Sequence, residues 1–423
     1  MHYLPVQTEK RPGRDRTRKA LVFLALLSML ILSSSCTVQG KASGPGNPGQ
    51  LSPTPTRIAT VLPTPSSVNQ PIVSIHMIDV NTGWVVTTSI PSQGGPTSQV
   101  LRTTDGGASF QDVTPKQHAP LAGDIATDFL DASTAWLTVA QSTPTLLVLR
   151  TSDGGQTWQQ ATVQSPTDPV LAGNFLGGQM TFINQEDGWI EGHLGVASGS
   201  EAVVIYRTTD GGRTWTNVSS ASPDLDPNAP GTLPFTGDKS GLGFVDASTG
   251  WATGTESANS FSWLYVTHDA GRTWHQQTLP IPSGAVPVQV ETDPPTFFTA
   301  HDGVLPVRLV TPQASLPYLY LTHDAGSTWN SSTPLPASSA DFLDVNRGWA
   351  TDMHTVYATH DGGQHWITLT TFKSPQAIGT PDFVTSDIGW AIVGTNAGPL
   401  LLKTTDGGHT WKAIFPFQTG VSV

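Results

Sequence analysis

The sequence predicts an all-β protein, a seven-bladed β-propeller made of four-stranded antiparallel blades. Two repeated signatures carry this prediction. A turn centred on Asp-Gly-Gly or Asp-Ala-Gly occurs seven times, and a second signature that ends in Trp precedes six of the copies. The composition agrees, because 42 Gly, 34 Pro and only 12% charged residues suit many short strands and turns.

Residues 1–36 have the features of an export signal. A basic run from Lys10 to Lys19 precedes thirteen apolar residues, ALVFLALLSMLIL, which are too few for a membrane span of about 20 residues. The segment ends at Cys36, the only cysteine of the chain, and resembles the lipobox of bacterial lipoproteins, whose cysteine carries lipid. We therefore expect export and a lipid anchor on the outer face of the bacterial cell membrane. The alternative is an ordinary secretory signal.

Residues 37–70 are rich in Pro, Ser, Thr and Gly and hold few large apolar side chains. Such a segment cannot bury enough surface to offset its ordering entropy, so we expect an extended tether. Its short apolar piece RIATVLP (57–63) leaves one alternative open. The ring closes either with four strands of its own last blade or with this piece as an added outer strand.

The charge distribution argues against a nucleic-acid partner. Residues 1–36 hold six of the 20 Lys and Arg and two of the 32 acids. Residues 37–423 therefore hold 14 bases and 30 acids, a net charge of −16. Binding to nucleic acid needs a basic surface. With a single cysteine, the exported part also cannot form an internal disulfide.

The repeated turn reads TTDGGASF, TSDGGQTW, TTDGGRTW, THDAGRTW, THDAGSTW, THDGGQHW and TTDGGHTW. Its aspartates are Asp105, Asp153, Asp210, Asp269, Asp324, Asp361 and Asp406. Six copies end in tryptophan, at Trp158, Trp215, Trp274, Trp329, Trp366 and Trp411. Asp can bond nearby backbone N–H groups and Gly tolerates positive φ, so the signature predicts a tight hairpin turn between two strands.

The second signature reads IDVNTGW, LDASTAW, NQEDGW, VDASTGW, LDVNRGW and TSDIGW, and the fifth unit has only TAHDGV in its place. Each unit then reads as four strands, and stacking seven such sheets radially hides faces that a lone sheet would expose. The predicted propeller covers residues 71–423. Its blades span about 71–116, 122–164, 178–220, 240–280, 295–334, 340–372 and 380–417.

The turn signature resembles the Asp-box, or bacterial neuraminidase repeat, over residues 72–415. The pairing of both signatures is most similar to the photosystem II assembly and stability factors, which are noncatalytic propellers. The resemblance implies that the seven aspartates and six tryptophans are structural and lie away from any working centre. Seven aspartates spread around a ring also cannot converge on one substrate. The D-x-N-x-G pieces at Asp79–Gly83 and Asp344–Gly348 are expected to be turns rather than calcium loops, because they lack the following Glu.

The sequence predicts that the chain is not an enzyme. A sialidase-like site needs three arginines, and only Arg308 of the exported arginines lies outside the repeat and the tether. A glycosidase needs two acids across a cleft, and nothing in the sequence pairs the acids outside the two signatures. Examples among the loops are Asp124, Glu201, Asp224, Asp226, Glu256, Glu291 and Asp293. No metal site or cofactor is expected, since His268, His323 and His360 belong to the repeated turn.

Strand parity places both signatures at one end of the blades and the variable loops at the other, where recognition is expected. Phe261 and Trp263 stand outside the repeat and form a candidate aromatic contact, with a buried strand end as the alternative. Two functions remain. The first is a lipid-anchored scaffold that binds an unknown protein. The second is a surface protein that binds or cleaves glycans. A pair of acids on the loop side would favour the second function.

Overall fold

The computed structural model describes residues 72–89, 95–167, 171–196, 199–222, 231–256, 262–373, 376–396 and 398–416, all within one compact unit of the chain. The expected signal segment, Cys36, the tether and its RIATVLP piece lie outside these ranges. Strands make up the described part, together with one short 3-10 helix, η1 (Lys116–His118). In these ranges no helix is long and apolar enough to cross a bilayer.

The first three repeats each form an antiparallel sheet in chain order, and β5 adds to β3. Repeat 1 contains β1 (Ile72–Met77), β2 (Gly83–Ser89), β3 (Thr97–Thr103), β4 (Gln111–Asp112) and β5 (Leu121–Ala122). Repeat 2 contains β6 (Asp124–Phe129), β7 (Ala135–Ala140), β8 (Thr145–Thr151) and β9 (Gln159–Gln164). Repeat 3 contains β10 (Gly177–Phe182), β11 (Gly188–Val196), β12 (Glu201–Thr208) and β13 (Thr216–Ala221).

Repeats 4 and 5 share one nine-stranded sheet, joined by the single pair Thr255↔Glu291 between β15 and β18. Repeat 4 contains β14 (Asp238–Phe244), β15 (Gly250–Thr255), β16 (Leu264–Thr267) and β17 (His275–Gln276). Repeat 5 contains β18 (Gln289–Thr292), β19 (Thr296–Phe297), β20 (Gly303–Val310), β21 (Ser315–Thr322) and β22 (Asn330–Ser331). The Asp293-Pro294-Pro295 stretch splits the inner strand of repeat 5 into β18 and β19, because proline cannot donate to a ladder.

The last two repeats again form separate antiparallel sheets. Repeat 6 contains β23 (Ser339–Phe342), β24 (Gly348–Thr351), β25 (Thr355–Thr359) and β26 (Ile367–Thr371). Repeat 7 contains β27 (Ala377–Ile378), β28 (Asp382–Phe383), β29 (Gly389–Gly394), β30 (Leu400–Thr404) and β31 (Lys412–Pro416). Its outer strand β31, which pairs with β30, comes from the repeat itself. The prediction of an all-β fold of antiparallel sheets is confirmed for the described residues.

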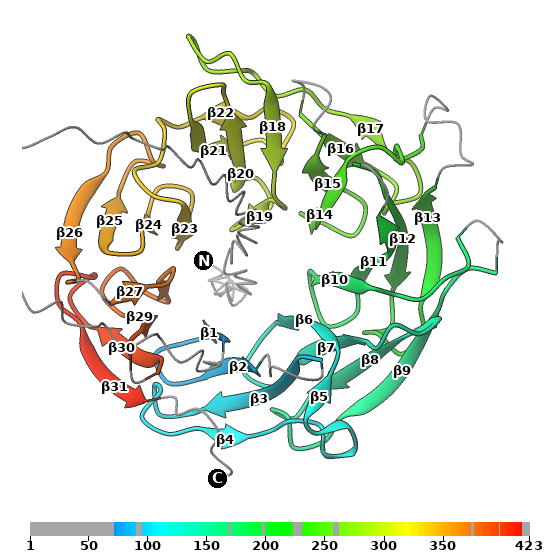
Figure 1. Ribbon diagram of the computed structural model, residues 1–423, viewed down its shortest axis with the longest axis horizontal. Helices are drawn as coiled ribbons and strands as arrows, with labels where there is room; N and C mark the ends of the chain where they lie inside the picture. Colours follow the sequence, from blue (N-terminus) through cyan, green and yellow to red (C-terminus); the bar gives the residue numbers. More distant parts are fainter. Residues whose placement is uncertain are drawn as a thin grey trace, which may run out of the picture. The chain divides into compact units, whose positions relative to one another are not determined.

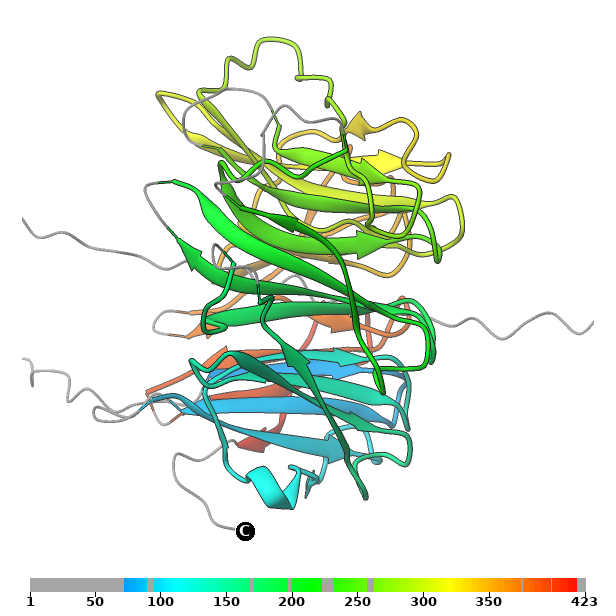
Figure 2. The same cartoon turned by 90° about the vertical axis from the view of Figure 1, so that its right-hand side faces the viewer.

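The sheets are arranged in a ring around a common centre, which is a β-propeller-like architecture (Figure 1; Figure 2). Core clusters lie between the sheets, and each cluster holds side chains from two consecutive repeats. A further cluster joins Ile75 and Met77 of repeat 1 to Trp390 and Leu401 of repeat 7, which closes the ring. The sheets therefore bury their faces against one another, as a lone four-stranded sheet cannot.

The two signatures lie at the same end of the sheets. In repeat 1, the backbone N–H of Gly106 in the Asp turn donates to the carbonyl oxygen of Asn81 in the Trp turn, at 2.7 Å. The other repeats make the same bond at 2.8 to 3.0 Å, including repeat 5, where Ala325 donates to His301 of the altered signature. We call this end the turn face. The opposite end, with the β2–β3-type loops and the connections between repeats, is called the loop face.

Tryptophans of the second signature fill the space between neighbouring sheets. Trp136 of repeat 2 is fully buried, stacks on Phe182 of repeat 3 with ring centroids 3.6 Å apart, and donates its indole N–H to the carbonyl oxygen of Gly211 at 2.8 Å. Phe182 lies opposite Gly188 in the β10–β11 register, and a Cβ at Gly188 would come within 2.4 Å of its ring. The glycine of the signature therefore makes room for the phenylalanine that the neighbouring tryptophan covers.

Replacement of Trp136 by Ala should lower the free energy of unfolding by about 3–5 kcal/mol, because it removes a fully buried indole and its hydrogen bond. Denaturant unfolding measures this loss. Ile367→Ala is the control, since Ile367 is exposed and its loss should change stability by less than about 0.5 kcal/mol. A loss below about 1 kcal/mol for the Trp136 variant would contradict the packing role.

Candidate functional site

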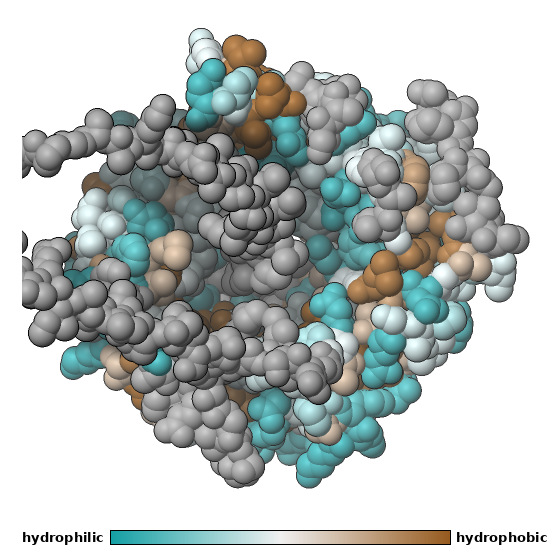
Figure 3. Space-filling view, viewed as in Figure 1, coloured by the Kyte–Doolittle hydropathy of each residue, from teal (hydrophilic) through white to brown (hydrophobic). Residues whose placement is uncertain are grey.

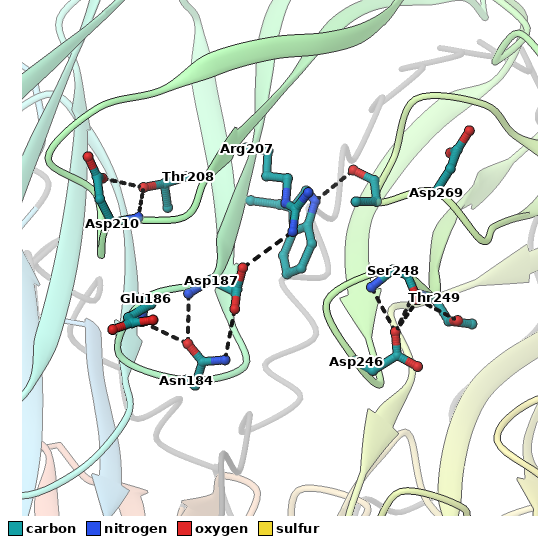
Figure 4. Close-up of polar contacts among 12 residues, drawn as sticks. Asn184, Glu186, Asp187, Arg207, Thr208, Asp210, Asp246, Ser248, Thr249 and Asp269 are labelled. Carbon is teal, nitrogen blue, oxygen red and sulfur yellow. Dashed lines mark hydrogen bonds and ion pairs between the residues drawn. The ribbon is translucent and has the colours of Figure 1, made fainter.

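The repeated aspartates are bonded within their own turns. Asp210 Oδ1 accepts from the Thr208 hydroxyl at 2.8 Å (Figure 4). It also accepts from the Thr214 backbone N–H at 2.9 Å, and Oδ2 accepts from the Thr214 hydroxyl. The other six turns repeat this pattern with Ser, Thr or His as the last partner. The hydroxyl and N–H of Thr410 hold the pKa of Asp406 at about 2 by the same bonds. The carboxylate oxygens of the repeated aspartates are therefore used as hydrogen-bond acceptors within their own turns.

The two pieces that resemble calcium loops are also turns. Asp79 Oδ1 accepts from the backbone N–H groups of Asn81 and Thr82, and Asp344 Oδ1 accepts from those of Asn346 and Arg347. Figure 4 shows the equivalent bonds from Ser248 and Thr249 to Asp246 in repeat 4. Within the described ranges, no group of three or more His, Cys, Asp and Glu residues is arranged to hold a metal ion.

The proposed aromatic contact is corrected by the structure. Trp263 is fully buried, donates its indole N–H to the Thr236 carbonyl oxygen at 3.0 Å, and lies under the Lys239 ammonium, 5.0 Å from its ring centroid. Trp263 directly precedes β16 and belongs to the core cluster between repeats 3 and 4, which matches the alternative of a buried strand end. Phe261 lies outside the described residues.

Exposed apolar side chains occur instead on the connection between β17 and β18, which projects at the edge of the ring (Figure 3). Val286 is 76% exposed, and Val288 and Ile281 are also exposed. The protein partner expected from the sequence stays a prediction, and this connection is a surface that it could contact.

An open groove of about 410 Å³ lies on the loop face between repeats 5 and 6. β20 and β21 of repeat 5 supply one wall, and the repeat 5–6 connection and the β24–β25 turn supply the other. Its lining includes Arg308, Ser315, Pro317, Leu335, Ser338 and Asp352. The Asp352 carboxylate accepts from the backbone N–H groups of His354 and Thr355 and from the Tyr357 hydroxyl, which hold it in place. The groove thus combines apolar surface with two fixed charged groups.

An acid pair stands next to this groove. Glu291 on β18 is directly opposite Arg308 on β20, and its Oε2 lies 3.5 Å from Arg308 Nε. Asp293 follows two residues later, where the backbone N–H of Asp293 donates to the Pro306 carbonyl oxygen at 3.0 Å. Burial raises the pKa of Asp293 to about 6, with Arg308 acting against this shift and Glu291 adding to it. Arg308 therefore pairs with one carboxyl and lowers the pKa of the other.

A second set of charged residues is buried between repeats 3 and 4, and we call it the repeat 3–4 cluster. His193 Nδ1 is 2.6 Å from Glu201 Oε1, and His193 Nε2 is 3.7 Å from Glu191 Oε1. Glu191 is fully buried, and neither of its oxygens has a hydrogen-bond partner among the described residues. The Lys239 ammonium lies within 3.1 Å of four backbone carbonyl oxygens, including that of Glu201.

Burial dominates the protonation of this cluster. It raises the pKa of Glu191 to about 7, opposed by His193. It lowers the pKa of Lys239 to about 8, opposed by Glu191 and Glu201. Burial also disfavours charged His193, but its bond to Glu201 and the nearby carboxylates outweigh this, so the pKa of His193 is raised. The cluster takes up protons near neutral pH.

The structure thus pairs acids that the sequence left unpaired. Glu201 joins the repeat 3–4 cluster, and Glu291 pairs with Arg308, which also lowers the pKa of Asp293. Asp224 and Asp226 lie outside the described residues. Sequence reasoning missed Glu191, His193 and Lys239 altogether. One signal was present: Glu191 and His193 follow Trp189 at every second position of β11, which places them on the side that packs against repeat 4.

No protein-family model and no curated protein sequence matches this chain. Solved structures do match. They include the GH74 xyloglucanase of Xanthomonas campestris, with a TM-score of 0.48 and 16% identity over 82% of this chain and 55% of the xyloglucanase. A puromycin-hydrolyzing peptidase of Mycobacterium tuberculosis gives 0.47 and 11% over 84% and 55%. A PL25 ulvan lyase gives 0.46 and 10% over 82% and 95%.

These neighbours correct one expectation. The sequence predicted that the chain is not an enzyme, and the structures named above are enzymes. The chain spans little more than half the length of the first two. At these identities and TM-scores, the likeness transfers neither a substrate nor a reaction. The resemblance to Asp-box proteins and to photosystem II factors stays a prediction.

Replacement of Glu191 by Gln should change how stability depends on pH. Its pKa rises from 4.5 to about 7 on folding, so between these values the folded protein keeps a proton that the unfolded chain releases. The free energy of unfolding of the wild type should therefore fall as pH rises through this window, by on the order of 3 kcal/mol. The variant should lose most of this slope and exceed the wild type in stability at pH 8.

Denaturant unfolding at pH 4.5, 6, 7 and 8 checks this prediction. Glu186→Gln is the matched control, because Glu186 lies exposed in the Trp turn of the same repeat. Equal slopes for the wild type and the Glu191 variant would show that the folded protein does not hold a proton at this carboxyl.

Proposed function

We propose that this chain is a carbohydrate-active protein, built as a seven-bladed propeller, that takes glycan in the groove between repeats 5 and 6. The observation that carries this is the acid pair of Glu291 and Asp293 beside Arg308, on the loop face. An acid pair in this position separates a carbohydrate-active protein from a plain scaffold, since carboxyl pairs bind sugar hydroxyls and cleave glycosidic bonds.

The side chains of the turn face are used in turn and ring contacts, which supports the choice of the loop face as the binding side. The aspartates of the turn face accept bonds from their own turns, and Arg102, Arg207 and Lys403 lie over the tryptophans of the second signature. Arg150 is opposite Trp136 in the register of β7 and β8. These side chains serve the ring, whereas Arg308 and Asp352 face an open groove. Apolar surface beside a few fixed polar groups is the usual make-up of a small-ligand site.

A bulky side chain in the groove should block glycan binding. Ser338→Trp should lower the affinity for any glycan bound by the wild type at least tenfold, because Ser338 is exposed and lines the groove. Asn81→Trp is the matched control, since Asn81 lines a hollow on the turn face and should change the affinity less than twofold. A glycan array followed by calorimetry measures both. Equal losses, or a loss only for the Asn81 variant, would place binding elsewhere.

We also propose that the protein is exported and anchored by lipid at Cys36, with the 37–70 segment as a tether to the membrane. The support is the order of basic run, apolar run and single cysteine in the sequence. Cys36→Ala should abolish incorporation of labelled palmitate and release the protein from the membrane fraction. Labelling that persists in this variant would contradict the anchor, because the chain has no other cysteine.

A further inference from the structure

We propose that the groove between repeats 5 and 6 is a hydrolytic site, in which Asp293 protonates the leaving oxygen of a glycoside and Glu291 activates water. This inference rests on the proposed function and adds a reaction to it. Among the described residues the groove has Arg308 at the end nearest the acid pair and Asp352 on the opposite wall.

The two carboxyls are held by the sheet rather than by a loop. Glu291 lies within the β18–β20 ladder, opposite Arg308. Asp293 follows β18 directly and is fixed by the bond of its backbone N–H to Pro306. Cα atoms two residues apart in extended backbone lie about 7 Å from each other, so the two acids are anchored at neighbouring points beside Arg308.

Their surroundings divide the two roles. Asp293 is the more desolvated group, and burial keeps a fraction of it protonated near neutral pH, as a general acid requires. The side chain of Glu291 is 36% exposed and lies 3.5 Å from Arg308, so solvent water can reach it. Arg308 contacts one acid and lowers the pKa of the other, which makes it a positioning residue.

The reaction is a hydrolysis with water as the only co-reactant. Asp293 gives its proton to the glycosidic oxygen while the bond from that oxygen to the anomeric carbon breaks, and the bonding electrons remain on the oxygen. Glu291 takes a proton from water, whose oxygen forms the new bond to the anomeric carbon. Exchange with solvent then returns the proton from Glu291 and reprotonates Asp293. One water molecule is consumed for each bond broken.

The groove walls fit a sugar chain. Asp352 presents a carboxylate that can accept from ligand hydroxyls, since backbone N–H groups and Tyr357 hold it in place. Pro317 and Leu335 offer apolar surface for the C–H faces of sugar rings. The repeat 3–4 cluster cannot play this part, because Glu191 is fully buried and cannot touch a substrate.

The test uses the full chain and polysaccharides bound by the wild type, with release of reducing ends as the readout. Glu291→Gln and Asp293→Asn should each lower kcat at least 100-fold. Both variants should still bind the glycan, because they leave the lining of the groove intact, and both should still unfold cooperatively. Glu186→Gln, on the turn face, should keep full activity. Hydrolysis that survives both acid substitutions would overturn the assignment.

The pH profile separates a chemical role from a structural one. Wild-type kcat should fall above about pH 6, as Asp293 loses its proton. Arg308→Gln removes a cation that lowers the pKa of Asp293, so this limb of the profile should move to higher pH. An unmoved limb would also count against the assignment. Glycan binding without any hydrolysis would refute the inference and leave the proposed function standing, whereas a wild type that binds no glycan would remove both.

Discussion

The structure depends on one packing unit, a tryptophan held between two neighbouring sheets. In repeats 2, 3 and 6 the indole of Trp136, Trp189 or Trp349 stacks on a phenylalanine of the next repeat, with ring centroids 3.6 Å apart. Each of these indoles also donates to a carbonyl oxygen of the next Asp turn. A sheet alone cannot bury two apolar faces, so this contact turns separate hairpins into a closed ring.

The same unit decides where chemistry can occur. It requires both signatures at one end of the sheets, and their Asp, Thr and Arg side chains are used there for turns and ring contacts. The loop face carries no such requirement, and its side chains vary from repeat to repeat. Loops on a rigid scaffold are free to carry function for this reason. The carboxyls whose pKa is raised by burial, Asp293 beside the groove and Glu191 in the repeat 3–4 cluster, lie away from the turns.

The groove coincides with the repeat that departs most from the pattern. Repeat 5 lacks the tryptophan of the second signature, has its inner strand split at Asp293, and shares a sheet with repeat 4. These departures leave Glu291 opposite Arg308, the one exported arginine outside the repeat and the tether, with Asp293 two residues further along. Local departures from a regular pattern concentrate at functional sites, because function requires residue types and geometries that stability alone does not favour.

The sequence by itself determined the strands, the turns and the seven-fold period, since Asp-Gly-Gly and Gly-Trp encode local geometry within a few residues. It also identified Arg308 as the exported arginine that lies outside the repeat and the tether. Only the tertiary structure decided which acids meet a charged partner, because Glu201 and His193 come together across a hairpin and Glu291 meets Arg308 across a ladder. It likewise decided that Trp263 is buried, where the sequence had left an exposed contact and a buried strand end open. Such pairings depend on strand register and on the neighbouring repeat, and neither can be derived from the spacing of residues along one strand.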